Sequence, residues 1–196
     1  MSARDDVLAA VRSALSGVSP EVEPVVSPRR QPVSDLLGHF VERVEDYRAV
    51  VVRTDAAGLA AAVAAALPAG ARVVVPDGLE LDVPGRVADT GLSATELDDV
   101  DAVVTACRVA IAETGTIVLD HDADQGRRAI TLVPDLHVCV VRADQVVLDV
   151  PDAMGRLDPR RPLTWISGPS ATSDIELERV EGVHGPRTLC VVLVEG

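Results

Sequence analysis

Aromatic residues are almost missing from this 196-residue chain, which contains one Phe, one Tyr and one Trp. The hydrophobic share of 47% must therefore build an aliphatic core. Platforms that stack nucleic-acid bases need aromatic faces, and a formal net charge of −13 repels nucleic acid and anionic membrane surfaces. We expect no nucleic-acid partner. The favoured interpretation of the negative charge is a surface that keeps the protein soluble, and the alternative is a surface that selects a basic partner.

Cysteine is scarce as well. Cys107, Cys139 and Cys190 form no C-x-x-C pair, so no zinc or iron–sulfur site is predicted and no metal ligand is assigned. Each lies in an apolar run, which predicts buried structural thiols in a reducing compartment. The opening residues carry acids where a signal peptide needs basic and apolar residues, and no apolar run approaches about 20 residues. We therefore expect a cytoplasmic protein with no membrane insertion.

Several catalytic motifs are absent too. The chain has no G-x-x-x-x-G-K-[ST], no G-x-G-x-x-G and no G-x-S-x-G, which argues against a P-loop NTPase, a Rossmann dehydrogenase and an α/β-hydrolase. Residues 120–124 begin like a calcium loop, but Gln125 and Thr131 occupy the positions that need Gly and Glu. A solvated acidic loop is the favoured prediction there, ahead of weak metal binding through His121.

The chain divides into an N-terminal arm, residues 1–33, and an α/β domain, residues 34–196. The arm holds an amphipathic helix over 2–15, which Ser2 can cap, and a linker with a proline at every fourth position. In the domain, apolar strand-like runs alternate with helices, which predicts a mainly parallel sheet with flanking helices. We expect helices at 34–45, 55–67, 93–97, 150–157 and 173–180, and strands at 48–53, 72–76, 102–107, 110–112, 116–119, 129–133, 136–141, 145–148, 163–167 and 188–194.

The run at residues 112–116 is the first candidate site. Glu113 interrupts two apolar runs, and Gly115 permits a turn with positive φ. An acid at the carboxyl end of a sheet strand lies where open α/β folds bind ligands, and it suits a nucleophile or general base. Thr114, Gly115 and Thr116 would then contact the ligand. In the structural alternative, Glu113 caps a neighbouring turn and the two threonines extend the strands.

The second candidate is a small polar loop between a strand and a predicted helix at residues 166–176. Its hydroxyl and backbone N–H groups suit a phosphate or carboxylate, and they belong to Ser167, Gly168, Ser170 and Thr172. The alternative is an ordinary helix cap, because Asp174 and Glu176 would oppose a bound anion. Downstream, His184 lies in a glycine-bounded turn and Arg187 could balance an anionic ligand, although a lone histidine is more often structural.

Four blocks together, residues 110–119, 132–137, 167–176 and 182–187, resemble the LUD-domain family, and in particular its lactate utilization protein C branch. The likeness extends from about residue 100 to the C-terminus. It implies a fold similar to the NagB/RpiA/CoA-transferase group. It also implies a part in oxidising L-lactate to pyruvate beside two partner proteins that carry iron–sulfur clusters, with no cofactor in this chain.

Three functions remain open at this point. The first is an accessory component of a lactate-oxidising system that binds a small carboxylate. The second is a free-standing enzyme of CoA-transferase or isomerase type, since CoA transferases of this fold use a glutamate in a Glu-x-Gly context and residues 113–115 are similar to it. The third is a module that senses an anionic metabolite without turnover.

Overall fold

The computed structural model describes residues 2–18, 33–169, 171–172, 180–181 and 185–196. The chain separates into two units, residues 1–32 and 33–196. The first unit contains α1 (Ala3–Ala14), whose N-terminus is capped as predicted: the Ser2 hydroxyl accepts from the Asp5 N–H, and the Asp5 carboxylate accepts from the Ser2 N–H. Among the described helices, none has both the length and the apolar character needed to span a membrane.

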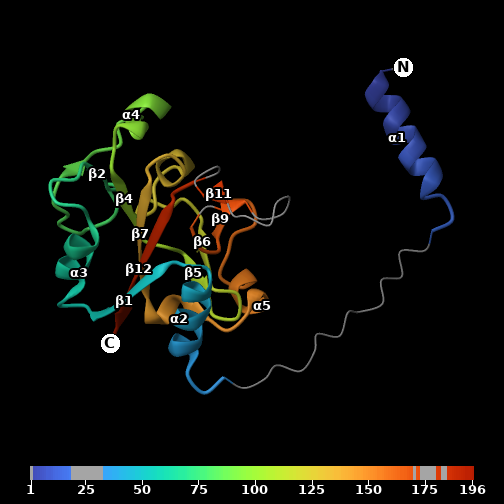
Figure 1. Ribbon diagram of the computed structural model, residues 1–196. Coiled ribbons are helices and arrows are strands. Elements are labelled where there is room, and N and C mark those ends of the chain that lie inside the picture. The colour runs from blue at the N-terminus through green and yellow to red at the C-terminus, as the bar shows by residue number, and fades with distance from the viewer. Residues whose placement is uncertain (1, 19–32, 170, 173–179, 182–184) are drawn as a thin grey trace. The chain divides into compact units, whose positions relative to one another are not determined.

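A six-stranded sheet forms the centre of the second unit, in the order β1-β12-β7-β4-β2-β3 (Figure 1). Its strands are β1 (Val50–Asp55), β2 (Val73–Val74), β3 (Arg86–Val87), β4 (Ala102–Thr105), β7 (Leu136–Arg142) and β12 (Thr188–Glu195). All neighbouring pairs are parallel, which confirms the predicted mainly parallel sheet. The central strands are mostly apolar and buried, as expected for a parallel sheet covered on both faces.

A smaller mixed sheet packs beside the large one, in the order β8-β5-β6-β9. Its strands are β5 (Val109–Ile111), β6 (Thr116–Leu119), β8 (Val146–Val147) and β9 (Thr164–Ile166). The chain leaves the large sheet at the end of β4 and enters the small sheet at β5, so residues 106–108 connect the two. β5 and β6 pair in antiparallel fashion. A two-stranded ladder joins β10 (Ala171–Thr172) to β11 (Val180–Glu181).

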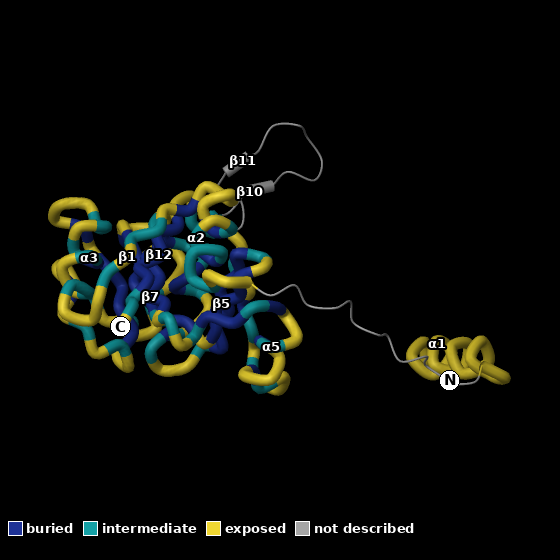
Figure 2. Tube along the Cα trace, turned by 90° about the horizontal axis from the view of Figure 1, so that it is seen from below, coloured by how far each residue is buried: buried dark blue, intermediate teal, exposed yellow. Residues whose placement is uncertain are grey.

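Helices cover both faces of the large sheet. The helices of this unit are α2 (Leu36–Asp46), α3 (Leu59–Ala66), α4 (Ala94–Asp98) and α5 (Val150–Met154). Val63 of α3 packs on one face, whereas Phe40 and Val44 of α2 pack between the other face and the small sheet. In Figure 2, β7 and β12 lie within the dark blue interior. The space between the two sheets is therefore filled by an apolar core.

The strand predicted at 129–133 is wrong. Residues Arg128–Thr131 form a 3-10 helix, η1, in which the Thr131 hydroxyl donates to the Arg128 carbonyl. The side chain of Ile130 anchors this turn, since it is fully buried in one cluster with Val74 and Val103. A second 3-10 turn, η2 (Ala143–Gln145), follows β7. The helix predicted at 173–180 lies outside the described residues over 173–179, and Val180 belongs to β11.

Candidate functional site

Glu113 lies in the tight turn that joins β5 to β6. This corrects the expected position, because β5 belongs to the small mixed sheet and the turn is not at the carboxyl edge of the parallel sheet. The Glu113 side chain is exposed, and its backbone N–H donates to the Leu148 carbonyl at 3.0 Å. It lines what we call the Glu113 pocket, which also includes His39, Arg43, Asp46, Tyr47 and Thr114.

Gly115 shapes this turn. Its φ is +57°, and a Cβ placed there would lie 2.7 Å from the Arg43 carbonyl carbon and oxygen. Glycine alone reaches this conformation without strain and permits such an approach of the hairpin to α2. The glycine in the run at residues 112–116 is therefore explained by backbone geometry.

A row of three hydroxyl groups connects the turn to the residue that follows β9. The hydroxyl oxygens of Thr114 and Thr116 lie 2.8 Å apart, and those of Thr116 and Ser167 also lie 2.8 Å apart. Thr116 is buried at the start of β6, and Ser167 follows β9. The structure thus brings Ser167, from the second predicted segment, into contact with the first.

Ser167 and Gly168 also line a second pocket, of about 310 Å³, which we call the Arg128 pocket. It lies where the amino ends of β7 and β12 meet β9 of the small sheet and the η1 turn. Among the described residues, its polar lining is supplied by Arg128, Thr131, His137, Thr164 and Ser167, and its apolar lining includes Leu132, Ile166 and Leu189. The pocket therefore combines one cation, several hydroxyl groups, an imidazole and an apolar wall.

Arg128 is the cation of this pocket. The preceding residue, Arg127, is held by two hydrogen bonds to Asp89 and a third to the Leu92 carbonyl. Arg128 is exposed, and no described carboxylate pairs with its guanidinium group. It is thus placed to meet an anion entering the pocket. Sequence reasoning missed Arg128, which comes directly before the run at 129–133 that was predicted as a strand.

His137, the second residue of β7, is only 1% exposed. Its Nε2 lies 2.8 Å from the Thr105 hydroxyl, which in turn lies 3.9 Å from the Cys139 sulfur. The hydrogen bond with the Cys107 thiol lowers the pKa of Cys139 and raises the pKa of Cys107, and burial adds to the rise at Cys107. A buried polar chain therefore leads from the two thiols to the pocket. The sequence signal was an isolated histidine at the start of an apolar strand.

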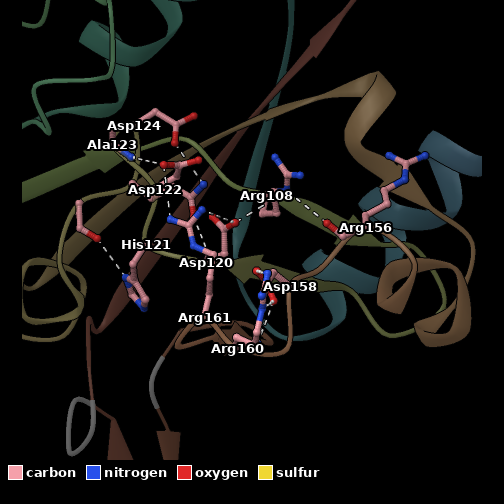
Figure 3. Close-up of polar contacts among 12 residues, drawn as sticks. Arg108, Asp120, His121, Asp122, Ala123, Asp124, Arg156, Asp158, Arg160 and Arg161 are labelled. Atoms are coloured by element: carbon pink, nitrogen blue, oxygen red, sulfur yellow. Dashed lines mark hydrogen bonds and ion pairs between the residues drawn. The ribbon is translucent and has the colours of Figure 1, made fainter.

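All three cysteines are free and buried, as predicted. Asp120, by contrast, does not lie in a solvated loop. Its carboxylate is 3% exposed, with Oδ2 at 3.4 Å from Arg161 Nη1 and 3.8 Å from Arg108 Nε (Figure 3). A carboxylate in an apolar setting requires such cationic neighbours, and the two arginines come from distant parts of the chain.

His121 connects this acidic loop to the Arg128 pocket. Its φ of +56° is unusual for a residue with a side chain. Both ring nitrogens are engaged: Nδ1 lies 3.0 Å from the Gly126 carbonyl oxygen, and Nε2 lies 2.8 Å from the Thr164 hydroxyl. Because Thr164 lines the pocket, His121 supports the pocket wall through this contact. His121 itself does not line the pocket.

The remaining predicted ligand-binding residues are not gathered at either pocket by the described contacts. Ser170 and His184 lie outside the described residues, and Thr172 belongs to β10. Arg187 is exposed, and its Nε lies 3.3 Å from Asp135 Oδ1. The assignment of these four residues stays a prediction.

The comparisons with known proteins agree with the fold. The family profile described as the LUD domain matches residues 86–194. Lactate utilization protein C of Deinococcus radiodurans is 48% identical, over 98% of this chain and 95% of that protein. Lactate utilization protein C of Bacillus subtilis is 30% identical over 46% of this chain and 41% of its own length. A crystal structure of a DUF162 family protein from Deinococcus radiodurans superposes with a TM-score of 0.71, at 44% identity, over 83% of this chain and 99% of that chain.

Proposed function

Because the chain belongs to the LUD-domain family, we propose that it acts in lactate utilization and binds a small 2-hydroxy or 2-oxo carboxylate in the Arg128 pocket. In this proposal it is an accessory component in the oxidation of L-lactate to pyruvate, in the cytoplasm. The observation that carries it is a polar pocket with an available arginine, in a chain similar to lactate utilization protein C over nearly its whole length.

The chemistry of the pocket suits such a ligand. An arginine guanidinium group can bind both oxygens of a carboxylate, and a charge-assisted pair of this kind is stronger than a neutral hydrogen bond. The hydroxyl groups of Thr131, Thr164 and Ser167 can meet the remaining oxygen atoms, while Leu189 offers an apolar surface to a methyl group. A volume of about 310 Å³ lies at the small end of the range for ligand pockets.

The absence of lysine from the sequence excludes one mechanism for binding a 2-oxo acid. All 18 basic residues in the printed sequence are arginines, and none is a lysine. No side chain of this sequence can therefore capture a 2-oxo acid as a lysine Schiff base. Oxidation of lactate also needs an acceptor for two electrons, and the cysteine spacing predicts no cluster in this chain. The family resemblance implies partner proteins that carry iron–sulfur clusters, and we propose that electron transfer takes place in them.

The test combines binding and turnover. L-lactate, pyruvate and acetate are titrated into the purified chain by isothermal calorimetry, and thermal unfolding is followed at saturating ligand. A ligand that binds the native state must raise the melting temperature by mass action. Lactate-dependent dye reduction is then measured for the iron–sulfur partners with and without this chain. The proposal predicts binding of the carboxylates and faster dye reduction when the chain is present. An unchanged melting temperature and equal rates would contradict it.

A second candidate function uses Glu113. The exposed carboxylate beside His39 and Arg43 is accessible to an acyl group, which favours the CoA-transferase or isomerase alternative. Acyl-CoA assays on wild type and Glu113→Gln test it, since an acyl-accepting nucleophile cannot be replaced by an amide. Equal rates in the two proteins would exclude this function. The third function, a sensor without turnover, predicts that the chain binds the carboxylates, does not change the rate of lactate-dependent dye reduction and shows no activity in the acyl-CoA assay.

A further inference from the structure

We propose that the Arg128 pocket binds 2-hydroxy or 2-oxo monocarboxylates whose side chain is uncharged, aliphatic and several atoms longer than the methyl group of lactate. This inference rests on the proposed function, since it names the class of ligand that the same pocket takes. Three observations carry it: the charges around the pocket, the aliphatic side chains in its lining, and its volume.

The charged residues around the pocket limit the ligand to one anionic group. Among the described residues that line it, Arg128 is the one arginine, and none is an aspartate or a glutamate. A second carboxylate or a phosphate ester would enter without a second guanidinium group to pair with, and an ammonium group would enter without a carboxylate. A desolvated charge without a partner is costly. The part of the ligand beyond its 2-hydroxy or 2-oxo carboxylate group is therefore uncharged.

Three aliphatic side chains provide an apolar surface in the pocket. Leu189 is 3% exposed and belongs to the apolar core between the two sheets, and the half-buried Ile166 packs against the same core. Next to η1, Val133 packs against a separate apolar cluster, whereas its neighbour Leu132 lines the pocket. Because Arg128 is exposed, an acid that pairs with it at the mouth of the pocket extends its side chain towards these aliphatic residues.

The volume of the pocket leaves room for a longer side chain. At about 30 Å³ for each non-hydrogen atom, which is the share of a whole water molecule in the liquid, the six such atoms of lactate fill roughly 180 Å³. The pocket has a volume of about 310 Å³, so space for about four further atoms remains. Water is a poor occupant of this space, because a buried water molecule needs about two to four polar partners and aliphatic side chains supply none. An aliphatic extension of the ligand suits it better.

The first experiment varies the length of the ligand and keeps its carboxylate and hydroxyl groups. Isothermal calorimetry on the purified full chain compares L-lactate, 2-hydroxybutanoate and 2-hydroxypentanoate, in which each acid is one methylene longer than the one before. A buried methylene should strengthen binding by about fourfold, so 2-hydroxypentanoate should bind at least about tenfold more tightly than lactate. The pair of pyruvate and 2-oxopentanoate should show the same difference.

Two further ligands test the argument from charge. Malate carries a second carboxylate, and 2-aminopentanoate carries an ammonium group in place of the hydroxyl group of 2-hydroxypentanoate. Each should bind at least about tenfold more weakly than 2-hydroxypentanoate, because its additional charge has no partner of opposite sign among the described lining residues.

Leu132→Ala tests the aliphatic lining. It should reduce the preference for 2-hydroxypentanoate over lactate by about three- to fourfold, because it removes apolar surface that the longer side chain contacts. Leu79→Ala is the matched control, since Leu79 is also half-buried but packs against the core on the other face of the large sheet and does not line the pocket. It should leave the preference unchanged. The preference is a ratio of two affinities, so a general loss of stability does not alter it.

The outcomes separate this inference from the proposed function. Equal affinities for lactate and 2-hydroxypentanoate in wild type, binding of malate or 2-aminopentanoate as tight as that of 2-hydroxypentanoate, or the same preference in Leu132→Ala and Leu79→Ala would each overturn the inference while carboxylate binding stands. If none of the acids binds wild type, the proposed function fails, and the inference fails with it. The ligand series on wild type decides even if Leu132→Ala does not fold.

Discussion

The Glu113 pocket and the Arg128 pocket lie at opposite ends of one row of hydroxyl groups, and they are of similar volume, about 380 and 310 Å³. They differ in how their polar groups are held. Arg43, Asp46 and Tyr47 of the first are about 40% exposed or more, whereas His137 and Thr131 of the second are almost completely buried. A buried polar group is oriented by its neighbours and is kept from water. The inner wall of the second pocket is thus preorganised, although Arg128 and Ser167 at its mouth are exposed, whereas these side chains of the first pocket are oriented less by their neighbours.

The largest expected effect concerns the fold at the Glu113 turn. Gly115→Ala should destabilise the protein by roughly 2–4 kcal/mol, because a Cβ would overlap the Arg43 backbone at a positive φ. Gly70→Ala is the control, since Gly70 also has a positive φ but has open space around it. It should cost about 1 kcal/mol. Urea unfolding measures both, and equal losses would mean that the close approach to α2 is not important.

Arg128→Ala should weaken carboxylate binding by roughly 10- to 100-fold without changing stability, because it removes a charge-assisted pair. Arg160→Ala is the control, since Arg160 is 88% exposed, pairs with Asp158 and does not line the pocket. Calorimetry with L-lactate measures the difference. If the two variants bind alike, the pocket is not the carboxylate site.

A smaller effect concerns the support of the η1 turn. Hydrogen bonds from Arg127 lower the pKa of Asp89. A carboxylate whose pKa is lower in the folded state contributes stability above its unfolded pKa, about 4, and loses this contribution as the pH falls through the folded pKa. Wild type should therefore be more stable than Asp89→Asn by at most about 1 kcal/mol at pH 7, and this difference should become smaller at a pH below about 4. Urea unfolding at both pH values checks this, and a constant difference would contradict it.

The smallest effect is expected at Glu113 itself. Glu113→Gln should change lactate affinity by less than about twofold, because this side chain is exposed and lines the other pocket. The same calorimetry as for Arg128→Ala measures it. A loss comparable to that of Arg128→Ala would reverse the comparison and move the binding site to the Glu113 turn.

The sequence predicted the elements whose pattern is local. Continuous valine runs identified β4, β7 and β12, and Ser2 identified the start of α1. Residues 129–131 of η1 were predicted as part of a strand, because Ile130 and its apolar neighbours fit either structure over so short a run. Ser167 was predicted as a binding residue, yet its contact with Thr116 depends on a sheet pairing between distant strands.

His137 and Arg128 show why the site itself was harder to predict. Their importance depends on tertiary contacts. The His137 imidazole is paired with Thr105, and Asp89 pairs with Arg127, the residue next to Arg128. Neither relation has a sequence spacing that could be recognised beforehand. Asp120 is a similar case, since the arginines that make its burial possible are 12 and 41 positions away along the chain.

The place of β12 has a consequence for biosynthesis. This strand comes last in the sheet along the chain, yet it lies between β1 and β7 and pairs Val50 with Cys190. Until the ribosome has released it, β1 and β7 lack their shared neighbour and expose unpaired backbone edges, which are prone to association. The large sheet can be completed only after residues 188–195 have been synthesised. From this topology we expect the sheet to fold slowly and its unpaired strands to need protection in the nascent chain.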